Sequence, residues 1–119
     1  EAFTDFTVWH FVHSIGGTDF ITALPITVAA DTIYHLKISI DSSRQATIFV
    51  DGVQYNVANV SGSTGGTTAT AVQPDTAVTK TAALTNDVDL IPYVGIEAGA
   101  GAAEALHVHY ECISRIINE

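Results

Sequence analysis

Two histidines and a glutamate alternate near the end of the chain, in a pattern that would place all three on one face of a strand. They are His107, His109 and Glu111. Same-face neighbours in a strand lie roughly 6.5–7 Å apart, so two imidazoles can reach one Zn²⁺ or Cu²⁺ and the carboxylate can complete the site. Because no further ligand with metal spacing lies nearby in the sequence, the pattern favours a solvated or cross-strand-paired polar face.

A second group of chemistry-bearing side chains combines aromatic rings with imidazoles in residues 9–13. An aromatic ring can stack on the face of a sugar, although large aromatics more often belong to the core. We therefore expect Phe11 in the core and keep Trp9 as a candidate for glycan contact. The candidate glycan-binding residues are Trp9, His35, His107 and His109.

An acidic loop precedes residue 90 and offers oxygen ligands of the kind that Ca²⁺ prefers. Asp87 and Asp89 alternate there, next to Asn86, and they are the candidate metal ligands. The twelve-residue EF-hand pattern is absent, and a solvated turn in which Asp and Asn bond to nearby backbone is the favoured interpretation. No other cofactor is expected.

The charge balance and the motif content exclude several classes of function. The formal net charge is −9, from 13 acidic and 4 basic side chains, and the basic residues form no run. This argues against binding to nucleic acid or to anionic membranes, and no apolar run approaches the ~20 residues of a spanning helix. Catalytic signatures such as nucleophile elbows, phosphate loops and zinc-protease motifs are absent, so we expect a protein without enzymatic activity.

The clearest structural signal is a set of three short strands in residues 34–55. Apolar side chains alternate with polar ones along the first strand, which predicts a half-buried strand with Leu36, Ile38 and Ile40 on its apolar face. A polar turn at residues 41–44 leads to the second strand. Asp51-Gly52 then predicts a type I′ hairpin turn, because glycine accepts a positive φ without steric cost.

Further strands are predicted at residues 7–13, 20–28, 89–98 and 105–117. Residues 20–28 are predicted to be one or two short strands broken at Pro25, because proline cannot donate a ladder hydrogen bond. The inward set of the last strand consists of Leu106, Val108, Tyr110 and Cys112, which predicts a buried thiol. About seven to nine strands spaced by turns predict one all-β domain over residues 1–119, an antiparallel β-sandwich or jelly roll. The chain is alternatively a piece of a longer polypeptide.

Residues 58–86 change character, because a Gly/Ser/Thr-rich stretch without charge or periodicity begins at residue 62. A structureless segment of this length inside a compact domain is unusual. It is a functional excursion, a flexible surface loop or a β arm that orders against a neighbouring subunit, and its low charge favours the last two. We predict that residues 58–81 of this long Thr/Gly-rich loop or arm extend away from the sandwich.

Two of these elements carry a family resemblance. The strand, polar turn and aliphatic-aromatic strand ending in Asp51-Gly52 resemble the central hairpins of concanavalin A-like, laminin-G-like jelly rolls. Residues 105–117 resemble the last strand of those domains. More loosely, the whole pattern is similar to domains of tailed-bacteriophage virion proteins, in which jelly-roll modules decorate capsids or tip fibres. The chain is short for a complete domain of the laminin-G-like kind.

The resemblance implies a non-enzymatic structural protein of a bacteriophage virion, either a capsid decoration or a tail or fibre component on the surface of the extracellular particle. Its partners would be other virion proteins or copies of itself, so a homo-oligomer is expected. The alternative is a lectin-like, carbohydrate-binding module that recognises host or environmental glycans. Relatives of this kind often hold Ca²⁺ on Asp-rich loops.

Overall fold

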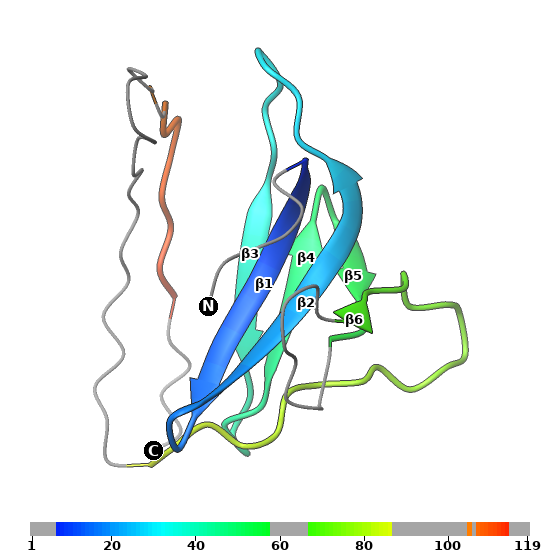
Figure 1. The fold of residues 1–119 in the computed structure, drawn as a ribbon, viewed down its shortest axis with the longest axis vertical. Coiled ribbons are helices and arrows are strands. Elements are labelled where there is room, and N and C mark those ends of the chain that lie inside the picture. Colours follow the sequence, from blue (N-terminus) through cyan, green and yellow to red (C-terminus); the bar gives the residue numbers. More distant parts are fainter. Residues whose placement is uncertain (1–6, 58–66, 87–104, 106, 115–119) are drawn as a thin grey trace. The chain divides into compact units, whose positions relative to one another are not determined.

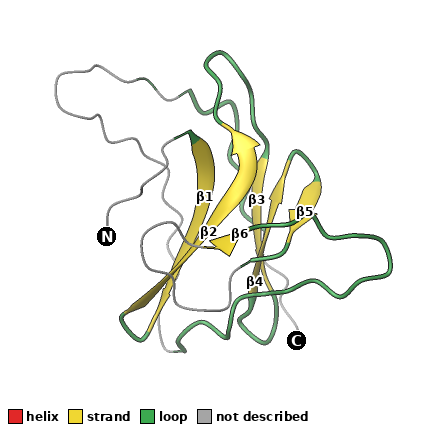
Figure 2. Cartoon of the chain, turned by 45° about the vertical axis from the view of Figure 1, so that its right-hand side comes forward, coloured by secondary structure: helices red, strands yellow, loops and turns green. Residues whose placement is uncertain are grey.

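The computed structural model describes residues 7–57, 67–86, 105 and 107–114. The chain divides into two units, Glu1–Val88 and Asp89–Glu119, and each is described here by itself. All regular secondary structure in the described residues is β, with no helix, which confirms the predicted all-β class (Figures 1 and 2). The first unit holds two three-stranded sheets.

The first sheet has the strand order β1-β2-β6. Strand β1 (Val8–Ile15) pairs antiparallel with β2 (Thr18–Thr27), and the short β6 (Thr67–Thr68) pairs parallel with β2. Gly16 and Gly17 form the whole connection between β1 and β2, with φ angles of 58° and 78°. Both positions require left-handed backbone, which glycine adopts without steric cost, so the predicted turn is a tight hairpin.

Pro25 lies inside β2 and does not end it, contrary to the prediction. The register of β1 and β2 shifts between the pairs Val8↔Thr27 and His10↔Ala23, so three residues of β2 stand opposite Trp9 alone. Pro25 is the middle residue of the three. A proline lacks the amide hydrogen of a regular ladder, and a bulge is where a strand tolerates that loss.

The second sheet has the order β3-β4-β5 and is antiparallel throughout. Strands β3 (Leu36–Ile40), β4 (Ala46–Val50) and β5 (Val53–Tyr55) confirm the three strands predicted in residues 34–55. Asp51 and Gly52 have φ angles of 49° and 81°, as the predicted hairpin turn requires. The Asp51 carboxylate also accepts a hydrogen bond from the backbone N–H of His35, which ties the start of β3 to this turn.

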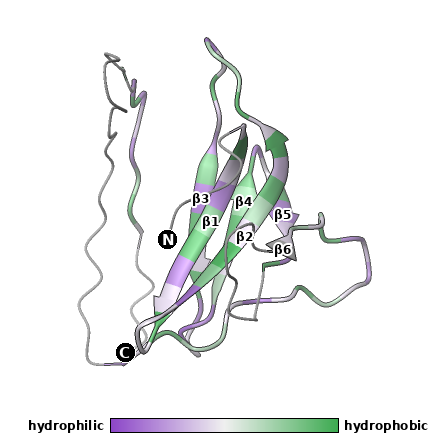
Figure 3. Cartoon of the chain, viewed as in Figure 1, coloured by the Kyte–Doolittle hydropathy of each residue, from purple (hydrophilic) through white to green (hydrophobic). Residues whose placement is uncertain are grey.

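One hydrophobic core joins the two sheets. Phe11 of β1 and Leu24 of β2 belong to the same buried cluster as Ile48 and Val50 of β4. The cluster is completed by Ala46, Tyr55, Val57 and Ala69. The two sheets therefore form two layers with their apolar faces together. Much of β2 and β4 is coloured as hydrophobic in Figure 3.

Residues 67–86 have little regular structure, as predicted, but two parts of this segment bond to the sheets. Ala69 and Thr81 are buried. The segment hydrogen-bonds to β5 through Val72 and Gln54, and to β4 through Thr81 and Ala46. The prediction that residues 58–81 extend away from the sandwich is therefore wrong for residues 69–72 and 79–81, whose backbone groups bond to the same chain, while residues 73–77 are exposed. Residues 58–66 lie outside the described part.

The second unit is described at residues 105 and 107–114. These residues enter no strand ladder, so the strand predicted at 105–117 is not present in the described part of it. Cys112 is exposed and not buried as predicted. The alternation of apolar and polar side chains supplies the two faces of a strand, but a strand also requires a hydrogen-bonded neighbour. The strand predicted at 89–98 lies outside the described residues.

Candidate functional site

The apolar row of β3 is unusually open to solvent. Leu36, Ile38 and Ile40 are 52%, 60% and 42% exposed, although the sequence pattern predicts a half-buried apolar face. They stand opposite Val50, Ile48 and Ala46 of β4, which are all buried. β3 is the edge strand of its sheet, so the difference reflects its position at the edge and not its composition.

A groove with a volume of about 350 Å³ lies along this row. β1 is the edge strand of the first sheet, and both β1 and β3 line the groove. The lining residues are Trp9, His10, Phe11, Val12, Leu24, Leu36, Ile38 and Ile48. None of them is an Asp, Glu, Lys or Arg, in a chain whose formal net charge is −9. We call the side of the two sheets formed by β1, β3 and this groove the open edge.

Trp9 forms a fixed wall of the open edge. Its ring packs edge-to-face against Tyr34, with centroids 5.4 Å apart and planes at 71°. Tyr34 is held in turn, because its hydroxyl donates to the carbonyl of Thr27 at 3.0 Å and accepts from the N–H of Ala29 at 2.9 Å. The indole Nε1 of Trp9 is buried and has no hydrogen-bond partner in the described residues. Trp9 therefore packs against the core and also lines the groove.

Of the two candidate glycan-binding residues in the first unit, Trp9 lines the groove and His35 does not. His35 is exposed, with its Nδ1 atom 3.4 Å from the Asp51 carboxylate at the β4–β5 turn. His107 and His109 are exposed residues of the second unit.

The predicted metal ligands Asp87 and Asp89 lie outside the described residues. Within residues 7–57, 67–86, 105 and 107–114, no group of three or more His, Cys, Asp or Glu side chains could hold a metal ion. The Ca²⁺ prediction therefore stays a prediction.

His13 is a buried titratable residue that is not among the candidate site residues predicted from the sequence. Its ring stacks on Phe20 with centroids 4.7 Å apart and also contacts Phe11. Neither ring nitrogen has a hydrogen-bond partner in the described residues. Burial lowers the pKa of His13 below its usual value of 6.5, because desolvation penalises the charged imidazolium. The sequence signal that could have identified His13 as buried is its alternation with Trp9 and Phe11, which places it on the same, inward face of β1.

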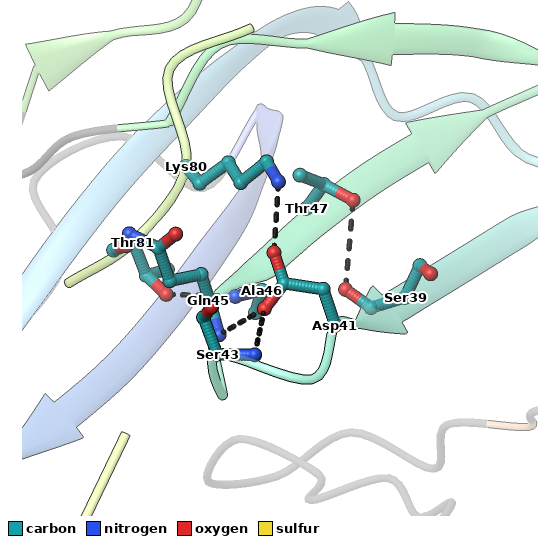
Figure 4. Close-up of polar contacts among 8 residues, drawn as sticks. All are labelled: Ser39, Asp41, Ser43, Gln45, Ala46, Thr47, Lys80 and Thr81. Carbon is teal, nitrogen blue, oxygen red and sulfur yellow. Dashed lines mark hydrogen bonds and ion pairs between the residues drawn. The ribbon is translucent and has the colours of Figure 1, made fainter. Parts of the chain in front are cut away.

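The opposite side of the two sheets is closed by polar contacts (Figure 4). We call β5, β6 and residues 69–86 the closed edge. Thr81 is fully buried there; its hydroxyl accepts from the N–H of Ala46 at 2.8 Å, and its own N–H donates to the Ala46 carbonyl at 3.1 Å. Gln45 adds a hydrogen bond from its side-chain amide to the carbonyl of Thr81.

Asp41 connects the β3–β4 turn to the same segment. Its carboxylate accepts from Lys80 Nζ at 2.8 Å and from the N–H groups of Gln45 and Ser43 at 3.0 and 2.9 Å. These contacts, with the Lys80 hydrogen bond first, lower the pKa of Asp41 below its usual value. The polar turn predicted at residues 41–44 is thus also an anchor for residues 80–84.

Comparisons of the chain with models of protein families, with curated proteins and with solved structures found no match. The described residues contain no helix long and apolar enough to cross a membrane.

Proposed function

We propose that this chain is a non-enzymatic structural protein that acts through protein–protein contacts, as a capsid decoration or a tail or fibre component of a bacteriophage virion. In this proposal the two layers are the centre of an antiparallel β-sandwich of the jelly-roll, concanavalin A-like kind. The virion setting and the fold family rest on the sequence resemblance alone. The contact function rests on the structure of the open edge.

The observation that carries the proposal is the uncharged apolar groove between two strand edges. Contiguous apolar surface of this kind marks interaction sites in proteins. Leu36 and Ile38 are more than half exposed in a chain that buries smaller residues such as Ala46. Two copies with a formal net charge of −9 repel each other. The electrostatic cost of bringing them together is therefore lowest at an uncharged groove.

The lectin alternative receives less support from the groove. Sugar sites combine an aromatic platform with several polar groups that bond the hydroxyls. The groove contains the Trp9 ring, but His10 is the only lining residue whose side chain is strongly polar. A glycan array with the intact chain and a Trp9→Ala variant, in the presence of Ca²⁺, distinguishes the two functions. Binding that disappears in the variant would favour the lectin.

Two measurements test the structural function directly. Light scattering coupled to size-exclusion chromatography over a wide concentration range should show self-association of the intact chain. Density-gradient fractionation of the native source, followed by mass spectrometry, should place the chain in particle fractions. A monomer at every concentration that is also absent from particles would contradict the proposal.

A further inference from the structure

The end of the β1–β2 hairpin depends on one buried side chain. Its cross-strand pairs run from His13↔Phe20 to Ile15↔Thr18, beside the turn. We call residues 13–20 the hairpin end. Within it, His13 is buried, and every other residue is exposed or half-buried. A strand end with few buried side chains has a low local free energy of opening. The contacts of His13 therefore carry much of what keeps this end closed.

The contacts of the His13 ring are aromatic. The ring stacks on Phe20 with an angle of 10° between the planes and centroids 4.7 Å apart, and it lies 5.6 Å from the Phe11 centroid. Both ring nitrogens are buried without a hydrogen-bond partner in the part of the chain that the structure describes. A protonated imidazole has two N–H donors, and each buried donor without an acceptor destabilises the closed state. This contact therefore suits the neutral ring.

The charged and titratable groups of the adjoining strands lie away from His13 or are bonded elsewhere. Asp19 pairs with Ser14, so strand alternation places it on the opposite face of the hairpin from His13, and it is exposed. The same alternation places His10 on the other face of β1. The groups of the second sheet and its turn are Tyr55 in the core, Lys37 over the outer Phe49 ring, Asp41 bonded to Lys80, and Arg44 bonded to the Leu84 carbonyl.

Burial decides which protonation state the closed hairpin end prefers. An imidazolium ring over Phe20 gains a cation–π attraction. The pKa of His13 is nevertheless lowered by desolvation, so the lost hydration of the charged ring outweighs that attraction. An opened hairpin end returns the ring to water. A proton on His13 therefore shifts the local equilibrium toward the open hairpin end.

We propose that His13 is a proton-sensitive latch of the first sheet. Its neutral ring holds the hairpin end closed against Phe20, and its protonation at mildly acidic pH opens this end while β3, β4 and β5 stay paired. Phe11, which contacts His13, lines the groove together with Val12, so opening alters one wall of the groove. The consequence that acid weakens contacts made through the groove rests on the proposed structural function.

Amide hydrogen exchange of the full chain tests the latch. Exchange is followed by NMR at pH 7.5 and 5.5, and each rate is divided by the intrinsic rate at that pH, which gives the opening equilibrium of each segment. With the ordinary pKa of 6.5 in the open state, opening of the hairpin end should increase several-fold, and by at most about tenfold, between these pH values. Amides of β4 are the reference and should change less, because the lowered pKa of Asp41 keeps its anchor ionised at pH 5.5.

The matched variant is His13→Phe, which keeps an aromatic ring on Phe20 but cannot bind a proton. Its hairpin end should show no comparable increase in opening between pH 7.5 and 5.5. A second measurement uses the wild-type chain alone and does not require the variant to fold. An NMR titration of the imidazole signals should show His13 changing its protonation state below pH 6.5.

Three outcomes would overturn the latch. The first is a His13 ring that titrates at or above pH 6.5, and the second is a hairpin end whose opening does not change between the two pH values. The third is an equal increase in β4, which would show that acid unfolds the whole unit and not the hairpin end.

The link to the proposed function has its own readout. Sedimentation velocity at pH 7.5 and 5.5 should show self-association that weakens with acid in the wild type and less in His13→Phe. A chain that self-associates equally at both pH values would remove the link and leave the proposed function standing. A chain that neither self-associates nor occurs in particles would remove the function, while amide exchange would still decide the latch.

Discussion

The closed edge and the open edge belong to the same pair of sheets but differ in which side chains they bury. At the closed edge a threonine, Thr81, is fully buried, and a small residue, Ala69, joins the core. At the open edge a large apolar residue, Ile38, is 60% exposed. Side-chain hydropathy alone would predict the reverse. In the described residues, a further segment of backbone is bonded to the strands at the closed edge.

Residues 69–86 close one edge because the strands there have partners for their backbone groups. Asn56 donates its N–H to Thr70, Val57 to Thr79, and Ala46 to the Thr81 hydroxyl. Once those bonds form, the segment covers the core with small side chains. Nothing in the described residues does the same for β1 and β3, whose pairings are with β2 and β4. Covering a core therefore depends on backbone partners as well as on apolar side chains.

The largest effect on stability is expected from removing the Thr81 hydroxyl at the closed edge. Thr81→Val keeps the size of the side chain but leaves the buried N–H of Ala46 without its acceptor. We expect a loss of about 1–3 kcal/mol in the free energy of unfolding, measured by urea denaturation. Thr81→Ser retains the hydroxyl and should lose less. Equal losses in the two variants would show that the hydroxyl contributes no specific stability.

Acidification should destabilise the fold through His13, near the middle of β1. The pKa of His13 is lowered in the folded state, so the unfolded chain binds a proton more readily. Above pH ~6.5 the His13 ring is neutral and its burial costs no charge desolvation. As the pH falls below ~6.5 toward the pKa of His13 in the folded state, the free energy of unfolding decreases. Urea denaturation of His13→Phe between pH 7.5 and 5 should show a weaker pH dependence than the wild type.

A His13→Phe variant with the wild-type slope between pH 7.5 and 5 would mean that other groups produce the acid sensitivity.

A smaller effect is expected from the ion pair that anchors residues 80–84. Lys80→Met removes the main contact that lowers the pKa of Asp41. The stabilisation from ionised Asp41 is present above its usual pKa of 3.8 and disappears as the pH falls toward the folded value. The variant should therefore have a slightly lower melting temperature at pH 7, and the difference should vanish at strongly acidic pH. A difference that persists there would point to lost packing of the lysine stem.

The smallest effect on folding stability is expected at the open edge. Ile38→Thr keeps a β-branched side chain in an exposed edge strand, so the free energy of unfolding at low protein concentration should change by about 0.5 kcal/mol or less. Self-association through the groove, which the proposed function requires, should weaken much more. A large loss of stability in the isolated copy would show that β3 is packed more tightly than its exposure indicates.

The sequence by itself determined the local elements of this protein. Alternation and turn chemistry placed β3, β4 and β5 and the Asp51-Gly52 hairpin, because period-two patterns and positive φ angles are properties of a few neighbouring residues. It also indicated that Phe11 is core. Pro25 was misjudged because a bulge depends on the register with β1, which its own neighbours do not encode.

Only the tertiary structure decided what covers each edge. The sequence pattern predicted that Ile38 lies on a buried face and that residues 58–81 project from the sandwich. The structure exposes Ile38 and bonds residues 69–72 and 79–81 to strands, because burial depends on which distant backbone bonds to a strand edge. For the candidate site, the sequence supplied Trp9, but the groove exists only because β1 and β3 are both edge strands. The buried, unpartnered state of His13 likewise follows from the packing of one sheet on the other, which no local pattern specifies.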